Sequence, residues 1–149
     1  MTPFFKHFSL LEFFPHCSHV EIVEALSSRS VSRNIVHLCL LLDSIRDSIG
    51  VPVRINSAYR SLTRNAKVGG VPTSQHLLGS AADVRKSRKL CDLFNSHRDR
   101  FHDLPDFLHR LGIYQLIEYD TFYHIGIYDE KHDPEHYPSV YINKTTKIF

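Results

Sequence analysis

The sequence predicts a single α+β domain of 149 residues, in which a small antiparallel sheet is flanked by helices. Residues 51–57 alternate as in a strand with one buried face, and residues 32–49 carry apolar side chains at three- and four-residue intervals, as in an amphipathic helix. Residues 113–118 and 122–127 are apolar segments separated by a short turn, which is typical of a hairpin. The length suits one domain with a hydrophobic core and is too short for two.

Two helices are expected in the first third of the chain. Ser9 and Glu12 have the spacing of a capping box, which predicts a short helix that begins at Ser9 and ends near Pro15. The longer helix runs from about Ser32 to Ile49, and its apolar stripe is expected to pack beneath the sheet.

The middle of the chain reads as strand, loop and strand. The strand of residues 51–57 is followed by a loop that contains Gly69-Gly70 and Pro72. A second strand is expected at Ala81-Ala-Asp-Val84, where small residues let neighbouring strands approach closely. His76 and Asp83 therefore flank a turn, and a turn can bring an imidazole and a carboxylate to the same point.

The remaining segments complete the predicted domain. Helices are expected at residues 87–97 and 104–111, before the hairpin, and Gly112 ends the second one. Residues 129–149 form a tail without a motif, whose lysines are expected to be solvated. The functional core of the domain is therefore expected between residues 51 and 128.

The composition excludes several classes of protein. Apolar residues make up 42% of the chain and charged residues 23%, so neither a disordered chain nor a membrane span is expected. The formal net charge of +2 is too small to indicate a nucleic-acid partner, although a mildly basic surface suits an anionic polymer such as a bacterial cell wall. No nucleic-acid binding is expected, and the domain is expected to be a monomer.

The cysteines and the first residues indicate where the chain is made. Cys17, Cys39 and Cys91 show no paired spacing, so free thiols in a reducing compartment are expected rather than a disulfide framework. Residues 1–16 are rich in phenylalanine but are interrupted by charged residues and by Pro15, which does not match a signal peptide. Synthesis in the cytoplasm without a signal peptide is expected.

Two histidines and an aspartate have the character of a zinc site. Neutral imidazole and ionised carboxylate suit zinc, which in catalytic sites takes three protein ligands and leaves a position for water. His76 and Asp83 supply two donors, and the alternation of residues 122–127 places His124 on one strand face together with Gly126. The glycine leaves space, as expected where a ligand approaches. The other histidines, including His132, share no spacing that links them, and structural roles are expected for them.

The motifs that carry these donors resemble a known family. They are Ser57-Ala-Tyr-Arg-Ser61, Asn65, Val68-Gly-Gly-Val71, Ser74-Gln-His76, Gly79, Ala81-Ala-Asp83 and Tyr123-His-Ile125. Their order is similar to that in the zinc D-Ala-D-Ala carboxypeptidase-like peptidases, the M15 group, and within it to the small phage-type branch. The resemblance extends from Phe8 to about Tyr128. It implies a Hedgehog/DD-peptidase-like fold, one zinc ion held by His76, Asp83 and His124, and cleavage of bacterial peptidoglycan peptides, as by an endolysin.

A general base must take a proton from the attacking water during amide hydrolysis. Glu118 and Asp120 are the candidates, because each precedes His124 by an even number of residues and would share its face in an extended chain. In many related enzymes an acidic residue stands three positions before the last histidine, where this chain has Thr121. In the small branch an acidic residue is associated with the end of the Gln-Leu-Ile strand, which favours Glu118 and leaves Asp120 as the alternative.

Three further residues are expected to contact the substrate. The resemblance implies that Arg60 faces the active site, where its guanidinium would stabilise an oxyanion or hold a substrate carboxylate. Ser74 and Gln75, next to a metal ligand, would be hydrogen-bond donors to the ligand shell or the substrate, or else ordinary loop residues.

The sequence therefore favours one function and leaves an alternative. The first is a zinc peptidase that hydrolyses peptidoglycan stem peptides or cross-links, either as a D-Ala-D-Ala carboxypeptidase or as an L,D-endopeptidase. It would act on the cell wall during phage lysis or as a virion component. The alternative is a metal-binding, catalytically weak domain that binds the cell wall, which is suggested by Thr121 at the usual position of the base.

Overall fold

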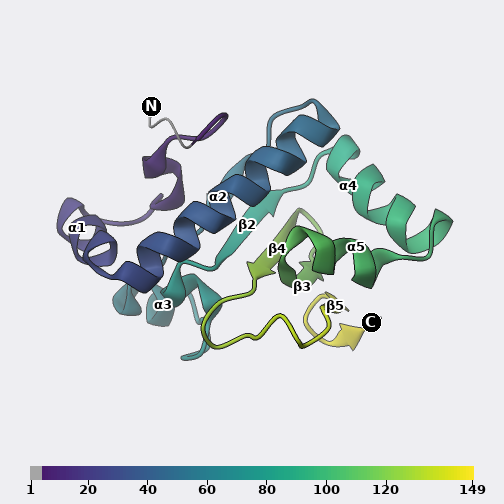
Figure 1. Cartoon of the computed structure of the whole chain (residues 1–149). Coiled ribbons are helices and arrows are strands. Elements are labelled where there is room, and N and C mark those ends of the chain that lie inside the picture. Colours follow the sequence, from purple (N-terminus) through teal and green to yellow (C-terminus); the bar gives the residue numbers. More distant parts are fainter. Residues whose placement is uncertain (1–4) are drawn as a thin grey trace.

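The computed structural model describes residues 5–149 and has the mixed α+β architecture that the sequence predicts (Figure 1). Within this range a six-stranded sheet has the order β1-β2-β4-β3-β5-β6. Neighbouring strands are antiparallel except for the parallel pair β3 and β5. The strands are β1 (Ile55–Ser57), β2 (Ala81–Arg85), β3 (Ile113–Glu118), β4 (Phe122–Ile127), β5 (Ser139–Ile142) and β6 (Thr146–Lys147).

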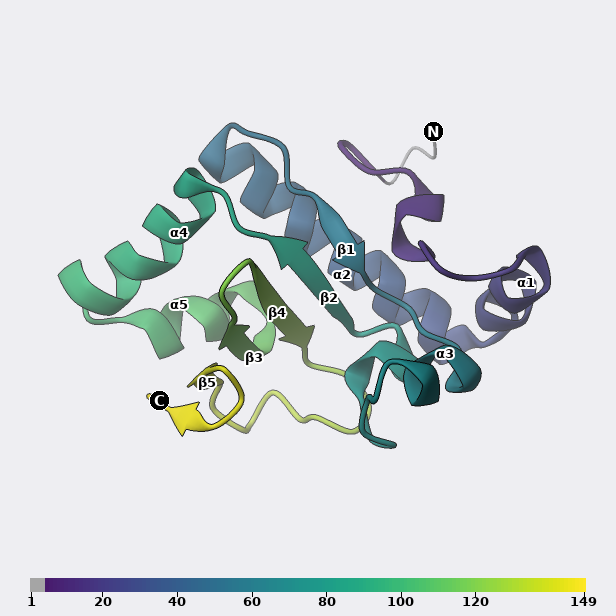
Figure 2. The ribbon, with the colours of Figure 1, turned by 180° about the vertical axis from the view of Figure 1, so that it is seen from behind.

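One face of this sheet is covered by the long helix α2 (Arg29–Ile49), and the opposite face is turned toward the viewer in Figure 2. The helices are α1 (His19–Ser27), α2 (Arg29–Ile49), α3 (Leu62–Lys67), α4 (Arg88–Asn95) and α5 (Leu104–Leu111). Helix α2 packs against β4, and residues of α2 and α5 line a common hollow. In the described residues no helix is both long and apolar enough to cross a membrane.

The predicted helices form for the expected local reasons. Ser9 and Glu12 make the capping box of a short 3₁₀ helix, Leu10–Phe13. Helix α2 begins three residues earlier than predicted because the hydroxyl of Ser28 accepts a hydrogen bond from the backbone N–H of Val31. It ends at Gly50, which has a left-handed conformation with φ of 71°.

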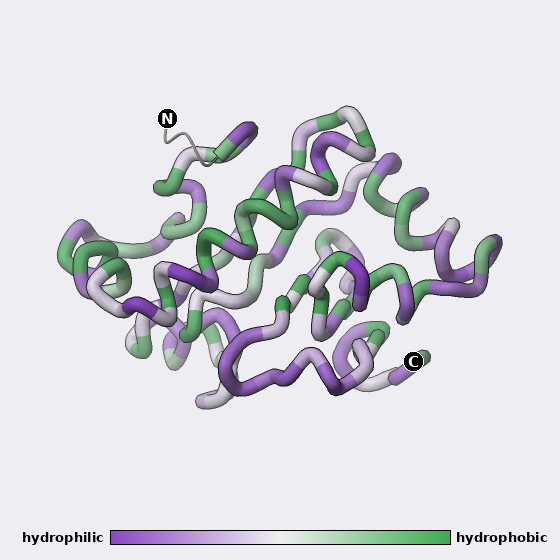
Figure 3. Tube along the Cα trace, viewed as in Figure 1, coloured by the Kyte–Doolittle hydropathy of each residue, from purple (hydrophilic) through white to green (hydrophobic). Residues whose placement is uncertain are grey.

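The core lies between α2 and the sheet. Leu38 and Leu42 of α2 are fully buried, as is Ile125 of β4. The expected inward face of β4 is confirmed, because Tyr123, Ile125 and Ile127 are all buried. Figure 3 shows hydrophobic residues recurring along α2, whereas the segment between β4 and β5 is mostly hydrophilic.

Several elements differ from the sequence-based predictions. Helix α1 was not expected, and the strand expected at residues 51–57 is reduced to Ile55–Ser57. The expected loop after β1 contains α3, because the Ser61 side chain accepts a hydrogen bond from Arg64 N–H and caps the helix. The tail, in which no motif was recognised, forms part of the sheet, because β5 pairs in parallel with β3 and β6 pairs with β5. The three cysteines are free thiols, as expected, and burial raises the pKa of Cys39 to about 12.

Candidate metal centre

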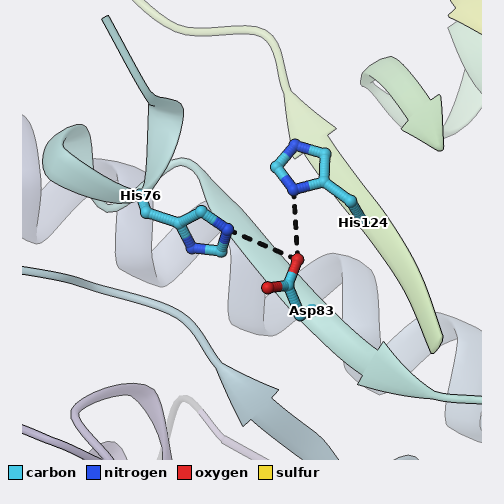
Figure 4. Close-up of side chains that lie close together, drawn as sticks. All are labelled: His76, Asp83 and His124. Carbon is cyan, nitrogen blue, oxygen red and sulfur yellow. Dashed lines mark hydrogen bonds and ion pairs between the residues drawn. The ribbon is translucent and has the colours of Figure 1, made fainter. Parts of the chain in front are cut away.

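Three side chains from separate elements converge on the open face of the sheet (Figure 4). Asp83 in β2 and His124 in β4 are directly opposite each other in the antiparallel pair, so their side chains share a face. His76 lies in a 3₁₀ helix, Gln75–Leu78, which ends at Gly79 with φ of 73° and leads into β2. The chain reversal at Gly79 therefore brings His76 back over Asp83.

The donor atoms are spaced as zinc requires. Asp83 Oδ1 lies 3.3 Å from His76 Nε2 and 3.1 Å from His124 Nδ1, and one donor atom of each residue lies within 4.8 Å of the others. Tetrahedral ligands at zinc bond lengths of about 2.0–2.2 Å are about 3.3 Å apart. The residues present therefore fit one zinc ion, with one coordination position left for a non-protein ligand.

A backbone contact fixes the orientation of the His76 ring. Its Nδ1 lies 2.7 Å from the carbonyl oxygen of Ala58, which can only accept a hydrogen bond, so Nδ1 donates. The lone pair of Nε2 is thereby directed at Asp83 and toward the expected metal position. Donation from the second ring nitrogen is the usual way in which proteins orient a metal-binding histidine.

The charge states of Asp83 and His124 also suit metal binding. Burial opposes ionisation of Asp83, but the hydrogen bond from His124 and the nearby His76 ring outweigh it and lower the pKa of the carboxyl group. Burial is the main cause of the lowered pKa of His124, although Asp83 acts in the opposite direction. An ionised carboxylate and a neutral imidazole are the forms that bind zinc.

Arg60 lies at the site, as expected, and contacts the second oxygen of Asp83. Its Nη2 is 3.4 Å from Asp83 Oδ2, while Nε lies 3.3 Å from Ser57 Oγ and Nη1 lies 3.5 Å from Asn65 Oδ1. These contacts hold the guanidinium in place at the wall of the pocket that contains the triad. Arg60 therefore orients Asp83 so that Oδ1 faces the two histidines.

Ser74 and Gln75 line the same pocket but also have structural partners. Ser74 Oγ accepts a hydrogen bond from His76 N–H at 3.3 Å and caps the 3₁₀ helix. Gln75 Nε2 donates to the carbonyl oxygen of Ile127 at 2.8 Å and to Asp129 Oδ2 at 3.1 Å. Both residues thus help to fix the helix that carries His76.

Gly126 has a different role from the expected one. A Cβ atom built at Gly126 would lie 2.0 Å from Gln75 Oε1, so the space beside the glycine is filled by the Gln75 side chain. The missing side chain makes room for this internal contact and not for an approaching ligand.

The structure does not bring Glu118 or Asp120 to the triad. The expectation that Glu118 shares a face with His124 is wrong, because Glu118 pairs with Tyr123 and Ile117 pairs with His124. On the opposite face Glu118 Oε2 lies 2.8 Å from Lys86 Nζ.

The hairpin turn explains this difference. The backbone N–H of Tyr119 donates to the carbonyl oxygen of Phe122 at 2.9 Å, and the turn reverses the chain between Glu118 and His124. Residues on the two sides of this turn therefore need not share a face, even when an even number of positions separates them. Asp120 is exposed in this turn, and neither acidic residue lines the pocket.

The pocket also contains residues that the sequence did not indicate. It has a volume of about 420 Å³, and its wall includes Tyr114, Ile117, Tyr119, His132 and Lys144. The expectation of a purely structural role for His132 took no account of Asp129, three residues earlier, whose Oδ1 lies 2.8 Å from His132 Nδ1. The spacing of His132 from Asp129 was the only feature of the sequence that linked these residues, and it did not show that His132 lies in the pocket of the triad.

Comparison with known proteins agrees with this geometry. The sequence pattern of the peptidase M15 family matches residues 6–125, which is most of the chain. A segment of 60 residues is 37% identical to the zinc D-Ala-D-Ala carboxypeptidase of Streptomyces albus G. This segment is 39% of the present chain and 24% of that relative, so the chain spans less than two thirds of the relative's length. On the family match, the chain belongs to the peptidase M15 family of metallopeptidases.

Proposed function

We propose that this protein is a zinc-dependent peptidase that hydrolyses peptide bonds in bacterial peptidoglycan stem peptides or cross-links. The observation that carries the proposal is the convergence of His76, Asp83 and His124, with neighbouring donor atoms 3.1–3.3 Å apart. Family membership supports a peptidase, and the similarity to a zinc D-Ala-D-Ala carboxypeptidase supports peptidoglycan as the source of the substrate.

The side chains of the pocket have distinct roles in this proposal. A bound zinc ion supplies Lewis acidity that polarises the carbonyl group of a scissile amide. Ala58 orients His76 through its carbonyl oxygen, and Arg60 orients Asp83. Arg60 also brings a fixed positive charge to the wall of the pocket, where it would stabilise developing negative charge on the carbonyl oxygen.

Removal of the metal should abolish the activity reversibly. We expect a chelator to stop the release of peptide fragments from purified peptidoglycan, and one equivalent of added zinc to restore it, because three protein donors cannot polarise a carbonyl without the ion. Products are measured by mass spectrometry of muropeptides. Cleavage that continues at the same rate in chelated protein, with zinc loss verified by elemental analysis, would contradict the proposal.

A metal-binding domain with weak catalysis is the second candidate. The observation in its favour is that, of the carboxylates in residues 5–149, only Asp83 lines the metal pocket. Strong binding to peptidoglycan and stoichiometric zinc, without release of peptides, would favour this candidate over the peptidase.

Glu118→Gln tests whether an acidic residue at the end of β3 acts as the base. We expect this variant to keep its zinc and its turnover within about twofold, because Glu118 is paired with Lys86 on the opposite face of the sheet. The loss of this partly exposed ion pair should cost about 1 kcal/mol of stability or less. Asp120→Asn is the parallel variant. Loss of turnover with retained zinc in either variant would instead assign the base to that residue.

The setting of the activity is part of the same proposal. We infer that the protein acts as a monomer on the cell wall of a bacterium, either during phage lysis or as a virion component, without a nucleic-acid partner. The mildly basic charge of +2 is compatible with an anionic polymer. Size-exclusion chromatography, and lysis assays on cells treated from outside and from inside, test these points.

A further inference from the structure

A row of side chains crosses the open face of the sheet one step beyond the triad. Strands β1, β2, β4 and β3 lie side by side in this order (Figure 2). Arg85 follows Asp83 by two positions on β2 and pairs with Phe122 of β4, so both side chains lie on the face of the triad. Two residues span about 6.6 Å of a strand, so this row is close to the metal position.

Arg54 extends the row to the edge of the sheet. The backbone N–H of Arg85 donates to the carbonyl oxygen of Arg54 at 2.9 Å, so the two residues are opposite each other on neighbouring segments. Val53 is buried and Ile55 packs against the core, so alternation turns the Arg54 side chain to the opposite face. Both arginines are exposed. Two positive side chains therefore start from opposite positions on the face that carries the triad.

The protein does not neutralise this pair of charges. Among residues 5–149, neither Arg54 nor Arg85 lies within 4.0 Å of a carboxylate oxygen, whereas Arg60 is paired with Asp83. Asp120, in the nearby hairpin turn, is exposed and forms no ion pair with the described residues. Like charges opposite each other on neighbouring strands are destabilising. An anionic group bound between the two arginines would remove their repulsion.

Two stacked aromatic rings connect the arginines to the metal pocket. The rings of Tyr119 and Phe122 have centroids 4.5 Å apart and planes 17° apart, and both line the pocket. Arg85 is the strand partner of Phe122 but lies outside the pocket wall. A ligand held at the triad therefore meets the arginines through a group that branches across Phe122 toward β1.

The chemistry of the pair favours a carboxylate on this branch. The planar fork of a guanidinium group binds both oxygens of a carboxylate, and arginine keeps its charge at every physiological pH. Peptidoglycan stem peptides offer two such branches. One is the α-carboxylate of the γ-linked glutamyl residue, and the other is the second carboxylate of diaminopimelate, where that residue replaces lysine.

We propose, on the basis of the function proposed above, that Arg85 and Arg54 form a subsite for a carboxylate that branches from the main chain of the bound peptide. Arg85, next to the pocket, is the main specificity residue, and Arg54 adds to its positive charge. Both residues select the substrate and take no part in the hydrolysis itself.

The first test uses the zinc-loaded full chain and four stem pentapeptides, alanyl-γ-glutamyl-X-alanyl-alanine. The glutamyl α-carboxylate is free or amidated, and X is lysine or diaminopimelate. We expect one of the two carboxylates to raise kcat/KM by about tenfold, because a charge-assisted contact at an exposed site is partly screened by solvent. The peptide pair that shows this preference identifies the carboxylate. A preference below about threefold for both would overturn the proposal.

The second test removes the charges one at a time. Arg85→Gln should lose the preference through a higher KM for the acidic peptide, with kcat, zinc content and the KM for the neutral peptide unchanged. Arg54→Gln should reduce the preference by a smaller factor. Arg88→Gln is the matched control, because Arg88 is exposed and close in sequence but begins helix α4. An unchanged preference in Arg85→Gln, or an equal loss in Arg88→Gln, would overturn the proposal.

Failure of the subsite and failure of the peptidase remain distinguishable. If the wild type cuts none of the peptides, the proposed function fails, and calorimetry of the same uncut peptides on the zinc-loaded and metal-free chains tests the subsite alone. Binding of the acidic form that is tighter by about threefold or more, and is lost in Arg85→Gln, would support the subsite. Equal or undetectable binding of the two forms would contradict it.

Discussion

His76→Ala should remove nearly all bound zinc and lower peptidase activity by at least about 100-fold, since the Lewis acidity of the metal is worth several kcal/mol. His76 supplies one of the three donors, through an Nε2 atom 3.3 Å from Asp83 Oδ1. The variant retains only Asp83 and His124, which cannot complete a catalytic zinc site with three protein ligands. Zinc per chain is measured by elemental analysis after dialysis, and activity by muropeptide release.

The control separates metal loss from unfolding. His16→Ala removes a histidine that is exposed and outside the pocket, so it should retain about one zinc ion per chain and full activity. Because His76 is 2% exposed, the thermal transition of His76→Ala must be recorded in metal-free protein alongside the wild type. A folded His76→Ala protein that keeps stoichiometric zinc would refute the assignment of this ligand.

Gly126→Ala should destabilise the metal-free protein by about 1–3 kcal/mol, the usual cost of overpacking a tight interior. The added Cβ would lie 2.0 Å from Gln75 Oε1, and Gln75 is 6% exposed, so its side chain has little freedom to move. Displacing it breaks the hydrogen bond from Nε2 to the carbonyl oxygen of Ile127. Urea unfolding, with the slope m compared between variants, measures the change.

A double-mutant cycle identifies the cause. In a Gln75→Ala background the clash is absent, so adding Gly126→Ala should cost at least 1 kcal/mol less than in the wild type, as a rough threshold for coupling of residues in contact. Gly112→Ala is the matched control: its φ of 82° imposes backbone strain, yet no atom lies within 4 Å of the added Cβ. Its cost should be the same in both backgrounds. Equal costs for Gly126→Ala in both would disprove the packing explanation.

The donor set could be predicted from sequence because local patterns fix most of it. The small residues around Asp83 and the alternation around His124 each indicate a strand, and strand periodicity decides which side chains share a face. The antiparallel pairing of β2 and β4 then aligns Asp83 with His124. Helix α2 was predictable for a similar reason, since its apolar stripe repeats over many turns.

The residues around the donors were not predictable in this way. Glu118 was assigned to the face of His124 by counting along the chain, but the register across a turn depends on the geometry of that turn. Lys144 reaches the pocket around the triad only because β5 pairs with β3, a contact between segments that are distant in sequence. The orientation of the His132 ring depends on the buried carboxylate of Asp129, which accepts hydrogen bonds from Ser80 and Gln75.

The sequence alone determined which side chains could bind a metal and on which local elements they lie, because ligand chemistry and the periodicity of strands and helices are properties of neighbouring residues. Tertiary structure decided what surrounds them: the opposite face for Glu118, the filled space at Gly126, and the placement of His132 and Lys144 in the wall of the pocket. These features depend on register and on contacts between distant segments, which no local pattern encodes.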